Sequence, residues 1–216
     1  MLFRSKGKHV MAEPGYLDLR SDVDALRWLV YQAAWSLAAG RPSALVRPMP
    51  RCAQVLALEI AVDSLAAAVV GLGGVVLEIA RIERPRGDLV PGDIARDLAT
   101  LAGRVLGGRA AGGRLVGIGV AVVGVVRRED GLVATAPNLG WRDVPLGERL
   151  RAALAGLVPA GLPVHVANEA DLGALAEHRR GVGRGFDDMI FVSGEVGVGG
   201  GVITDGRPLM GAAGYG

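Results

Sequence analysis

The spacing of apolar residues changes near residue 50. From Val23 to Ala39 they recur at helical spacing, after the capping candidate Ser21-Asp22 and before Gly40. From Arg51 onward, short runs rich in β-branched residues alternate with glycine-rich turns. The pattern therefore predicts an N-terminal leader over residues 1–50 with one helix, and a main body that starts at residue 51.

The first part of the main body predicts a three-stranded antiparallel meander followed by a crossover. Strands are predicted at 54–60, 65–70 and 75–79. A helix predicted from Pro91 to about Leu106 leads to the run Leu115 to Val123, whose β-branched content suits a strand buried on both faces. Because the helix returns the chain to a buried strand, we expect a crossover connection.

The remainder of the chain begins a second unit of similar layout. Two such units in tandem are typical of the actin-like (ribonuclease H-like, hexokinase and Hsp70 type) ATPase-domain fold, in which ligands bind between two lobes. We therefore predict an α/β fold of this class, with the first lobe over 51–145 and the start of a second lobe over 146–216. The predicted elements of this part are helices at 146–157 and 168–180 and strands at 164–167, 189–193 and 198–204.

The composition is that of a folded protein. Half of the 216 residues are apolar and 21% are charged, which argues against the disordered and fibrous classes. A single cysteine, Cys52, excludes an internal disulfide and a multi-cysteine zinc cluster and favours a cytoplasmic protein. The longest apolar stretch, Ala25 to Ala39, is shorter than the roughly 20 residues of a membrane-spanning helix, so we expect no membrane partner.

The net charge is only +2, but the N-terminal end is more basic than the rest. Residues 1–52 carry eight Lys or Arg against four acids. Such a bias is compatible with nucleic-acid binding, but a solvated tail has the same composition. Charge alone therefore leaves both alternatives open.

Asn168 and Glu169 form the first candidate site, at the join between a predicted strand and a predicted helix. In α/β sheets, ligands commonly bind beyond the carboxyl ends of strands. Asn168 is also a good helix N-cap, so a purely structural role is an equal alternative.

The glycine-rich stretch Gly194 to Gly201 is the second candidate, between two predicted strands. Successive glycine amides can form a nest that approaches an anion closely, because no Cβ blocks the way. A hairpin uses the same residues, but five glycines in eight positions exceed what a hairpin needs. The phosphate-loop-like positions are Gly194, Gly197, Gly199 and Gly200.

A third candidate joins the end of a buried strand to a polar turn. The predicted strand ends at Gly124, and Pro137-Asn138 brings an amide close to Trp141. Amides bind sugar hydroxyls and apolar surface binds the sugar ring. The alternative is a turn asparagine and a core tryptophan.

The order and spacing of these motifs closely resemble the ROK family (repressors, open reading frames and kinases). Gly-x-Gly-x-x-x-x-Gly ends at Gly124, and Ala-Pro-Asn-Leu-Gly-Trp ends at Trp141. Val-x-Val-x-Asn-Glu-Ala then spans 164–170, and the glycine-rich stretch precedes Asp-Gly-Arg-Pro-Leu at 205–209. The resemblance covers about residues 40–216 and implies the actin-like fold with hexose, N-acetylhexosamine or pentose ligands. The sugar-binding residues it implies are Gly124, Pro137, Asn138, Asn168 and Glu169.

Two positions separate regulators from kinases in this family. The kinases carry Asp-x-Gly-Gly-Thr at a first strand-turn, where the acid handles the metal and the glycines approach the ATP phosphates. The matching stretch here is Glu59 to Asp63, with Ala61 and Val62 in place of the glycines. Glu169 stands where the family has its catalytic Asp base, and the extra methylene can misplace the carboxylate.

The resemblance is therefore closest to ROK-type sugar-responsive transcriptional regulators without kinase activity. An alternative is an ATP-dependent sugar kinase, glucokinase-like or N-acetylhexosamine kinase-like, with ATP and Mg as cofactors and Glu169 as base. Another is a non-catalytic module that dimerises through Trp28 and Trp35. We expect a homo-oligomer that binds a small-molecule sugar.

The chain looks truncated at both ends when set against this family. A complete winged helix-turn-helix needs three helices and a β-wing, and the leader predicts only one helix. The resemblance would continue beyond Gly216 with a Gly-Glu-x-Gly-His segment and a cysteine-rich zinc loop. We therefore name no metal ligand, expect no cofactor in this chain, and expect DNA binding only if the parent protein has the complete reader domain.

Overall fold

The computed structural model describes residues 51–87, 89–108, 113–194, 196–209 and 211. The predicted leader helix, with Trp28 and Trp35, lies outside these residues. The described strands are β1 (Ala53–Ile60), β2 (Ser64–Gly71), β3 (Val75–Glu83), β4 (Arg114–Val122), β5 (Val125–Arg127), β6 (Leu132–Ala136), β7 (Trp141–Pro145), β8 (Val164–Asn168), β9 (Met189–Gly194), β10 (Val198–Thr204) and β11 (Arg207–Pro208). The helices are α2 (Pro91–Leu106), α3 (Leu146–Ala153), α4 (Glu169–Arg180) and a 3₁₀ turn, η2 (Pro137–Leu139).

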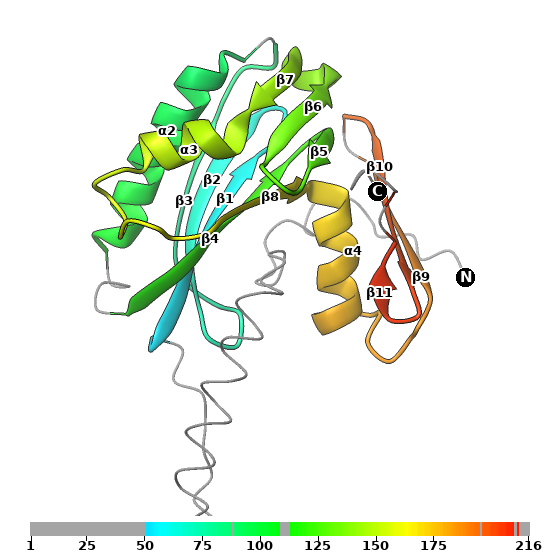
Figure 1. Ribbon diagram of the computed structural model, residues 1–216. Coiled ribbons are helices and arrows are strands. Elements are labelled where there is room, and N and C mark those ends of the chain that lie inside the picture. The colour runs from blue at the N-terminus through cyan, green and yellow to red at the C-terminus, as the bar shows by residue number, and fades with distance from the viewer. Residues whose placement is uncertain (1–50, 88, 109–112, 195, 210, 212–216) are drawn as a thin grey trace, which may run out of the picture.

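The main sheet has five strands in the order β3-β2-β1-β4-β8. The strands β1, β2 and β3 form the predicted antiparallel meander. The strand β4 then pairs parallel to β1, and β8 pairs parallel to β4, so the chain crosses over through α2 and α3. Figure 1 shows both helices on the same face of this sheet. The predicted meander, helix and crossover are all confirmed.

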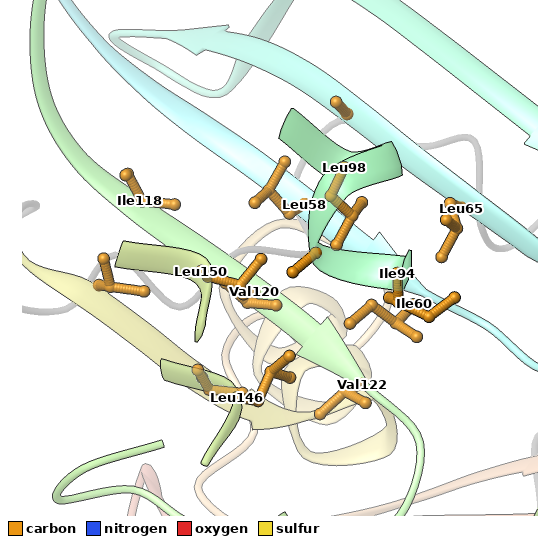
Figure 2. Packing of buried hydrophobic residues seen from close by; sticks show 14 of the residues in the cluster. Leu58, Ile60, Leu65, Ile94, Leu98, Ile118, Val120, Val122, Leu146 and Leu150 are labelled. Carbon is orange, nitrogen blue, oxygen red and sulfur yellow. The ribbon is translucent and has the colours of Figure 1, made fainter. Parts of the chain in front are cut away.

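The core of the first lobe lies between this sheet and its two helices. In α2, Pro91 occupies a position where its missing N–H costs nothing, and the buried Ile94, Leu98 and Leu101 follow helical spacing. Figure 2 shows side chains from α2 and α3 meeting those of β1 and β4. Fully burying one such Leu or Ile contributes about 1.5 to 3 kcal/mol to the hydrophobic driving force. The labelled members of this cluster are Leu58, Ile60, Leu65, Ile94, Leu98, Ile118, Val120, Val122, Leu146 and Leu150.

A small second sheet continues from the end of β4. The strands β5, β6 and β7 form it in that order, and η2 connects β6 to β7. Trp141 is buried in the core, and its Nε1 donates a hydrogen bond to the carbonyl of Leu89 at 2.5 Å. The core-tryptophan alternative is therefore confirmed.

The third sheet, in the order β11-β10-β9, packs on α4. Figure 1 shows α4 between the main sheet and the β9–β10 hairpin. Glycine allows this close packing: a Cβ on Gly201 would lie 2.6 Å from Cβ of Ala174, and one on Gly173 would lie 2.8 Å from Cε1 of Phe191.

The main sheet does not follow the lobe boundary expected between residues 145 and 146. The strand β8 was expected to open the second unit, but it pairs with β4 over five residues, from Ile118 opposite Val164 to Val122 opposite Asn168. The helix α3 also ends at Ala153, before the predicted end at 157. Among the described residues, no helix has both the length and the apolar character needed to cross a bilayer.

Candidate functional site

Three neighbouring parallel strands of the main sheet end at the same level. In the register of the sheet, Ile60 of β1 lies opposite Val122 of β4, which lies opposite Asn168 of β8. The residues that follow each strand therefore meet at one edge. This arrangement brings together the turn after β1, Gly124 and the Asn168-Glu169 pair, at the sheet edge where α/β proteins commonly bind ligands.

The side-chain amide of Asn168 is at the centre of this edge. Its Oδ1 accepts hydrogen bonds from the backbone N–H of Ala170 at 2.8 Å and of Asp171 at 3.2 Å. Its Nδ2 donates to the carbonyl of Gly124 at 2.7 Å and to Oε2 of Glu169 at 3.1 Å. The N-cap alternative is confirmed, and the same amide also joins α4 to the end of β4.

Gly124 has a backbone conformation that favours glycine. Its φ is 107°, in the region that side chains avoid. A Cβ at this position would lie 2.4 Å from the carbonyl oxygen of Thr135 and 2.7 Å from Cβ of Ala136. The glycine therefore lets the chain turn into β5 while its carbonyl faces Asn168.

Pro137 and Asn138 lie in η2, and both are exposed. A Cβ on Gly197 would lie 3.5 Å from Nδ2 of Asn138, so the β9–β10 connection comes close to this turn. A Cβ on Gly199 would lie 3.8 Å from Oε1 of Glu169. The structure thus places Asn138 and Glu169 each beside a glycine of the β9–β10 hairpin.

The glycine-rich stretch takes up hairpin geometry in its described part. Gly194 ends β9, and Gly199 and Gly200 lie within β10, paired with Ser193 and Val192. None of Gly194, Gly197, Gly199 and Gly200 is among the described residues with positive φ. The absence of side chains at 199 and 201 is explained by contact with α4. A Cβ on Gly194 would meet no atom within 4 Å, so contact with α4 accounts for two of the glycines of this stretch and not for all of them.

The turn after β1 is closed by a backbone hydrogen bond and carries two buried apolar residues. The N–H of Ala61 donates to the carbonyl of Ser64 at 3.0 Å, and the side chains of Ala61 and Val62 are buried, with exposed fractions of 9% and 8%. The carboxylate of Asp63 pairs with Arg86 at 3.2 Å. Apolar side chains fill this turn.

Sequence reasoning missed one ion pair beside this edge. Nη2 of Arg128, in the turn between β5 and β6, lies 3.4 Å from Oδ2 of Asp171 in the first turn of α4. Burial raises the pKa of Asp171, and the charge and hydrogen bond of Arg128 act in the opposite direction. Arg128 and Asp171 are 43 positions apart in the sequence, so no local spacing pattern links them. Arg127 is adjacent to Arg128, and the sequence does not show which of the two arginines pairs with Asp171.

The described residues contain no group of three or more His, Cys, Asp or Glu side chains arranged to hold a metal ion. The polar side chains near this edge are the amides of Asn138 and Asn168 and the carboxylate of Glu169. These groups can accept and donate hydrogen bonds to the hydroxyls of a polar small molecule.

Comparisons with known proteins agree with the sequence motifs. The ROK family model matches residues 55–216. The xylose repressor of Caldicellulosiruptor bescii is 39% identical over 98 residues, which cover 45% of this chain and 23% of the repressor.

Two solved structures are similar in fold. One is a ROK family transcriptional regulator, a homologue of the E. coli MLC protein, with a TM-score of 0.62 and 28% identity over 76% of this chain and 39% of that one. Another is a ROK family glucokinase from Streptomyces griseus, solved with glucose and AMPPNP, with a TM-score of 0.61 and 28% identity over 75% of this chain and 48% of that one.

This chain spans less than half the length of each of these three proteins. Its fold is the actin-like α/β fold of the ROK sugar kinases, as the sequence predicted. With a family match that covers most of its residues, this chain belongs to the ROK family.

Proposed function

We propose that this chain is the sugar-binding part of a ROK-type transcriptional regulator and that it does not transfer phosphate. The observation that carries this proposal is the filled turn after β1. Ala61 and Val62 are both buried. They stand at the two positions where ROK kinases share glycines. Two added side chains in this turn leave ATP phosphates no close approach to its backbone.

The proposed sugar site is the edge formed by Gly124, Asn138, Asn168 and Glu169, with Pro137 beside Asn138. The amide nitrogen Nδ2 of Asn168 donates to Oε2 of Glu169 at 3.1 Å, which holds the two side chains together. In the proposed site Asn168 orients the Glu169 carboxylate, which can accept hydrogen bonds from sugar hydroxyls, and the exposed amide of Asn138 can donate to them.

Glu169 supports binding better than it supports catalysis. A general base must reach the attacking hydroxyl at about 2.6 to 3.2 Å in a defined direction. In this chain the carboxylate accepts a hydrogen bond from Asn168 and carries one methylene more than Asp. Hydrogen bonding to a hydroxyl tolerates that displacement, whereas phosphoryl transfer loses on the order of 100-fold in rate for a misplacement of about 1 Å.

The relatives suggest which sugars to test first. One similar protein is named a xylose repressor, and another was solved with glucose. We therefore propose a pentose or hexose as the ligand. We also propose that the parent protein is cytoplasmic and homo-oligomeric, and that it binds DNA if it carries a complete winged helix-turn-helix.

A combined binding and activity assay tests the proposal. Isothermal titration calorimetry of this chain with xylose and with glucose measures binding, and ADP release in the presence of ATP, Mg²⁺ and each sugar measures phosphoryl transfer. We expect heat of binding for at least one sugar and no sugar-dependent ADP release. Sugar-dependent ADP release by this chain, or by the parent protein, would contradict the regulator proposal.

A sugar kinase is the second candidate, because a carboxylate is retained next to Asn168 and a glucokinase shares the fold. In that case Glu169 acts as the base, and ATP and Mg²⁺ are required. The triple variant Ala61→Gly, Val62→Gly and Glu169→Asp restores the kinase-like residues. A large gain in sugar-dependent ADP release in this variant favours kinase ancestry with residual function, and no gain rejects it.

A further inference from the structure

The first turn of α4 is attached to the β5–β6 region at two points. At the first, Nδ2 of Asn168 donates to the carbonyl of Gly124, just before β5, at 2.7 Å. At the second, Nη2 of Arg128, just after β5, lies 3.4 Å from Oδ2 of Asp171. Gly124 and Arg128 are four residues apart in the sequence. Asn168 and Asp171 are three residues apart, and Glu169 lies between them.

The second contact differs from a typical surface ion pair. The side chains of Arg128 and Asp171 are only 24% and 14% exposed. By comparison, the exposed fractions are 74% and 48% for Arg96 and Asp93 within α2. An ion pair shielded from water is screened less by salt and holds its two partners in a more defined geometry.

The two contacts act on the same end of α4. The helix packs on β9 and β10, and the hydrogen bond from Asn168 attaches its N-terminal end to the carbonyl of Gly124. The ion pair at Asp171, three residues further along the chain, attaches a second point of the same turn to the segment after β5. The backbone N–H of Asp171 also donates to Oδ1 of Asn168, which ties the two attachment points to each other.

We propose that Arg128 and Asp171 are a positioning pair for the sugar site. Their ion pair holds Asn168 and Glu169, at the start of α4, in place against Gly124 and the β5–β6 segment that leads to Asn138. Neither residue is proposed to contact the sugar. This inference rests on the proposed function for the identity of the ligand, but its mechanical part concerns the first turn of α4 alone.

Amide hydrogen exchange tests the mechanical part. In Arg128→Ala and in Asp171→Asn, the backbone amides of Ala170 and Asp171 should exchange roughly tenfold faster than in the wild type, because the helix start opens locally. Amides of the central strand β1, which report global unfolding, should change much less. Arg128→Lys keeps the charge and should recover most of the protection. Arg96→Ala removes an exposed ion pair within α2 and is the matched control, with no change expected at either place.

The ligand part is read from sugar affinity in the same variants. We expect Arg128→Ala to weaken binding of xylose or glucose roughly tenfold, with recovery in Arg128→Lys and no change in Arg96→Ala. If Arg128→Ala does not fold, the test uses Asp171→Asn, which nearly preserves the side-chain volume, and Arg128→Lys, which keeps the charge.

The possible failures can be distinguished. If the wild type binds neither sugar, the proposed function fails, while the exchange rates still decide whether the pair holds α4. If the amides of Ala170 and Asp171 exchange at wild-type rates in both Arg128→Ala and Asp171→Asn, or only in step with those of β1, the positioning role is wrong. Unchanged sugar affinity together with faster exchange at α4 also overturns it, because the pair would then order the helix without serving the site.

Discussion

Asn168 joins three parts of the molecule through one side-chain amide. Its oxygen caps α4, and its nitrogen reaches both Gly124 and Glu169. A capping oxygen satisfies helix N–H groups that have no partner inside the helix. The residue therefore affects stability and the proposed sugar site together.

Replacement of Asn168 separates these roles. Asn168→Ala should lower the free energy of unfolding by about 1 to 2 kcal/mol, because the cap is lost. Asn168→Asp keeps an oxygen for the cap but replaces the donor with an oxygen that faces the carbonyl of Gly124 and the carboxylate of Glu169, so it should weaken sugar binding while the cap is kept. Urea denaturation gives the first quantity and calorimetric titration the second. Equal stability of Asn168→Ala and the wild type would show that the cap is unimportant.

The carboxyl groups of Asp171 and Asp130 should affect the pH dependence of stability in opposite directions. Burial raises the pKa of Asp171 above its ordinary value of 3.8. The folded protein then holds this proton more tightly than the unfolded chain, so the stabilising contribution is present at low pH and is lost as the pH rises from 3.8 through the raised pKa. The hydrogen bond from Arg127 instead lowers the pKa of Asp130 to about 2, so its contribution is present above 3.8 and is lost as the pH falls toward 2.

The measurement is urea unfolding in steps from roughly pH 2 to 6. Relative to the wild type, Asp171→Asn should gain stability as the pH rises above 3.8, and Asp130→Asn should gain stability as the pH falls below 3.8. Parallel pH curves for the wild type and Asp171→Asn would contradict the effect of burial on this carboxyl.

At the scale of elements, α4 and the β9–β10 hairpin fit together through glycine. Cβ of Ala174 lies in the space that a side chain at Gly201 would occupy, at 2.6 Å, and the carbonyl of Ala170 lies 2.8 Å from the same point. A Cβ on Gly194 in β9 meets no atom within 4 Å. Of these two strand glycines, packing requires the absence of a side chain only at Gly201.

The pair Gly201→Ala and Gly194→Ala tests this packing. Overpacking costs about 1 to 3 kcal/mol when neighbours must shift, so we expect a loss of this size at 201. At 194 we expect no loss, since the space is open. Thermal or urea unfolding measures both, and a Gly201→Ala variant as stable as the wild type would show that α4 is not held against this hairpin.

The same elements show what a sequence can and cannot predict. The β-branched runs and the Pro91 helix start are local signals, so β1 to β4 and α2 were predicted to within a few residues. The parallel pairing of β8 with β4 is a contact between distant segments, and apolar runs do not encode their partners. For this reason β8 was assigned to the second unit. The Arg128–Asp171 pair was missed for the same reason, whereas Asn168 was found because capping is local.

At the scale of the whole molecule, one face of the β9–β10 hairpin is apolar and open to solvent. Alternation along the strands sends Phe191 and Gly201 toward α4 and the neighbouring residues outward. Ile190, Val192, Val198 and Val202 are 75%, 61%, 85% and 36% exposed. An apolar patch of this kind binds hydrophobic dyes and lowers solubility.

The effect of this patch on dye binding and solubility can be tested without knowledge of the function. The double variant Ile190→Thr and Val198→Thr should bind less of the dye ANS than the wild type and should be more soluble, while β-branched Thr preserves the strands. Val75→Thr, at an exposed site in β3, is the control and should change neither property. Dye fluorescence that is equal in the double variant and the wild type would place the exposed apolar surface elsewhere.

The central claim is that the carboxyl ends of β1, β4 and β8 present a sugar site. The most direct measurement is a ¹H–¹⁵N NMR titration of the chain with xylose and with glucose. The account predicts saturating shifts concentrated at the amides of Gly124, Asn138 and Ala170 for at least one of the two sugars. If neither sugar shifts these amides at saturating concentration, or if the shifts lie far from this edge, the proposed site is wrong.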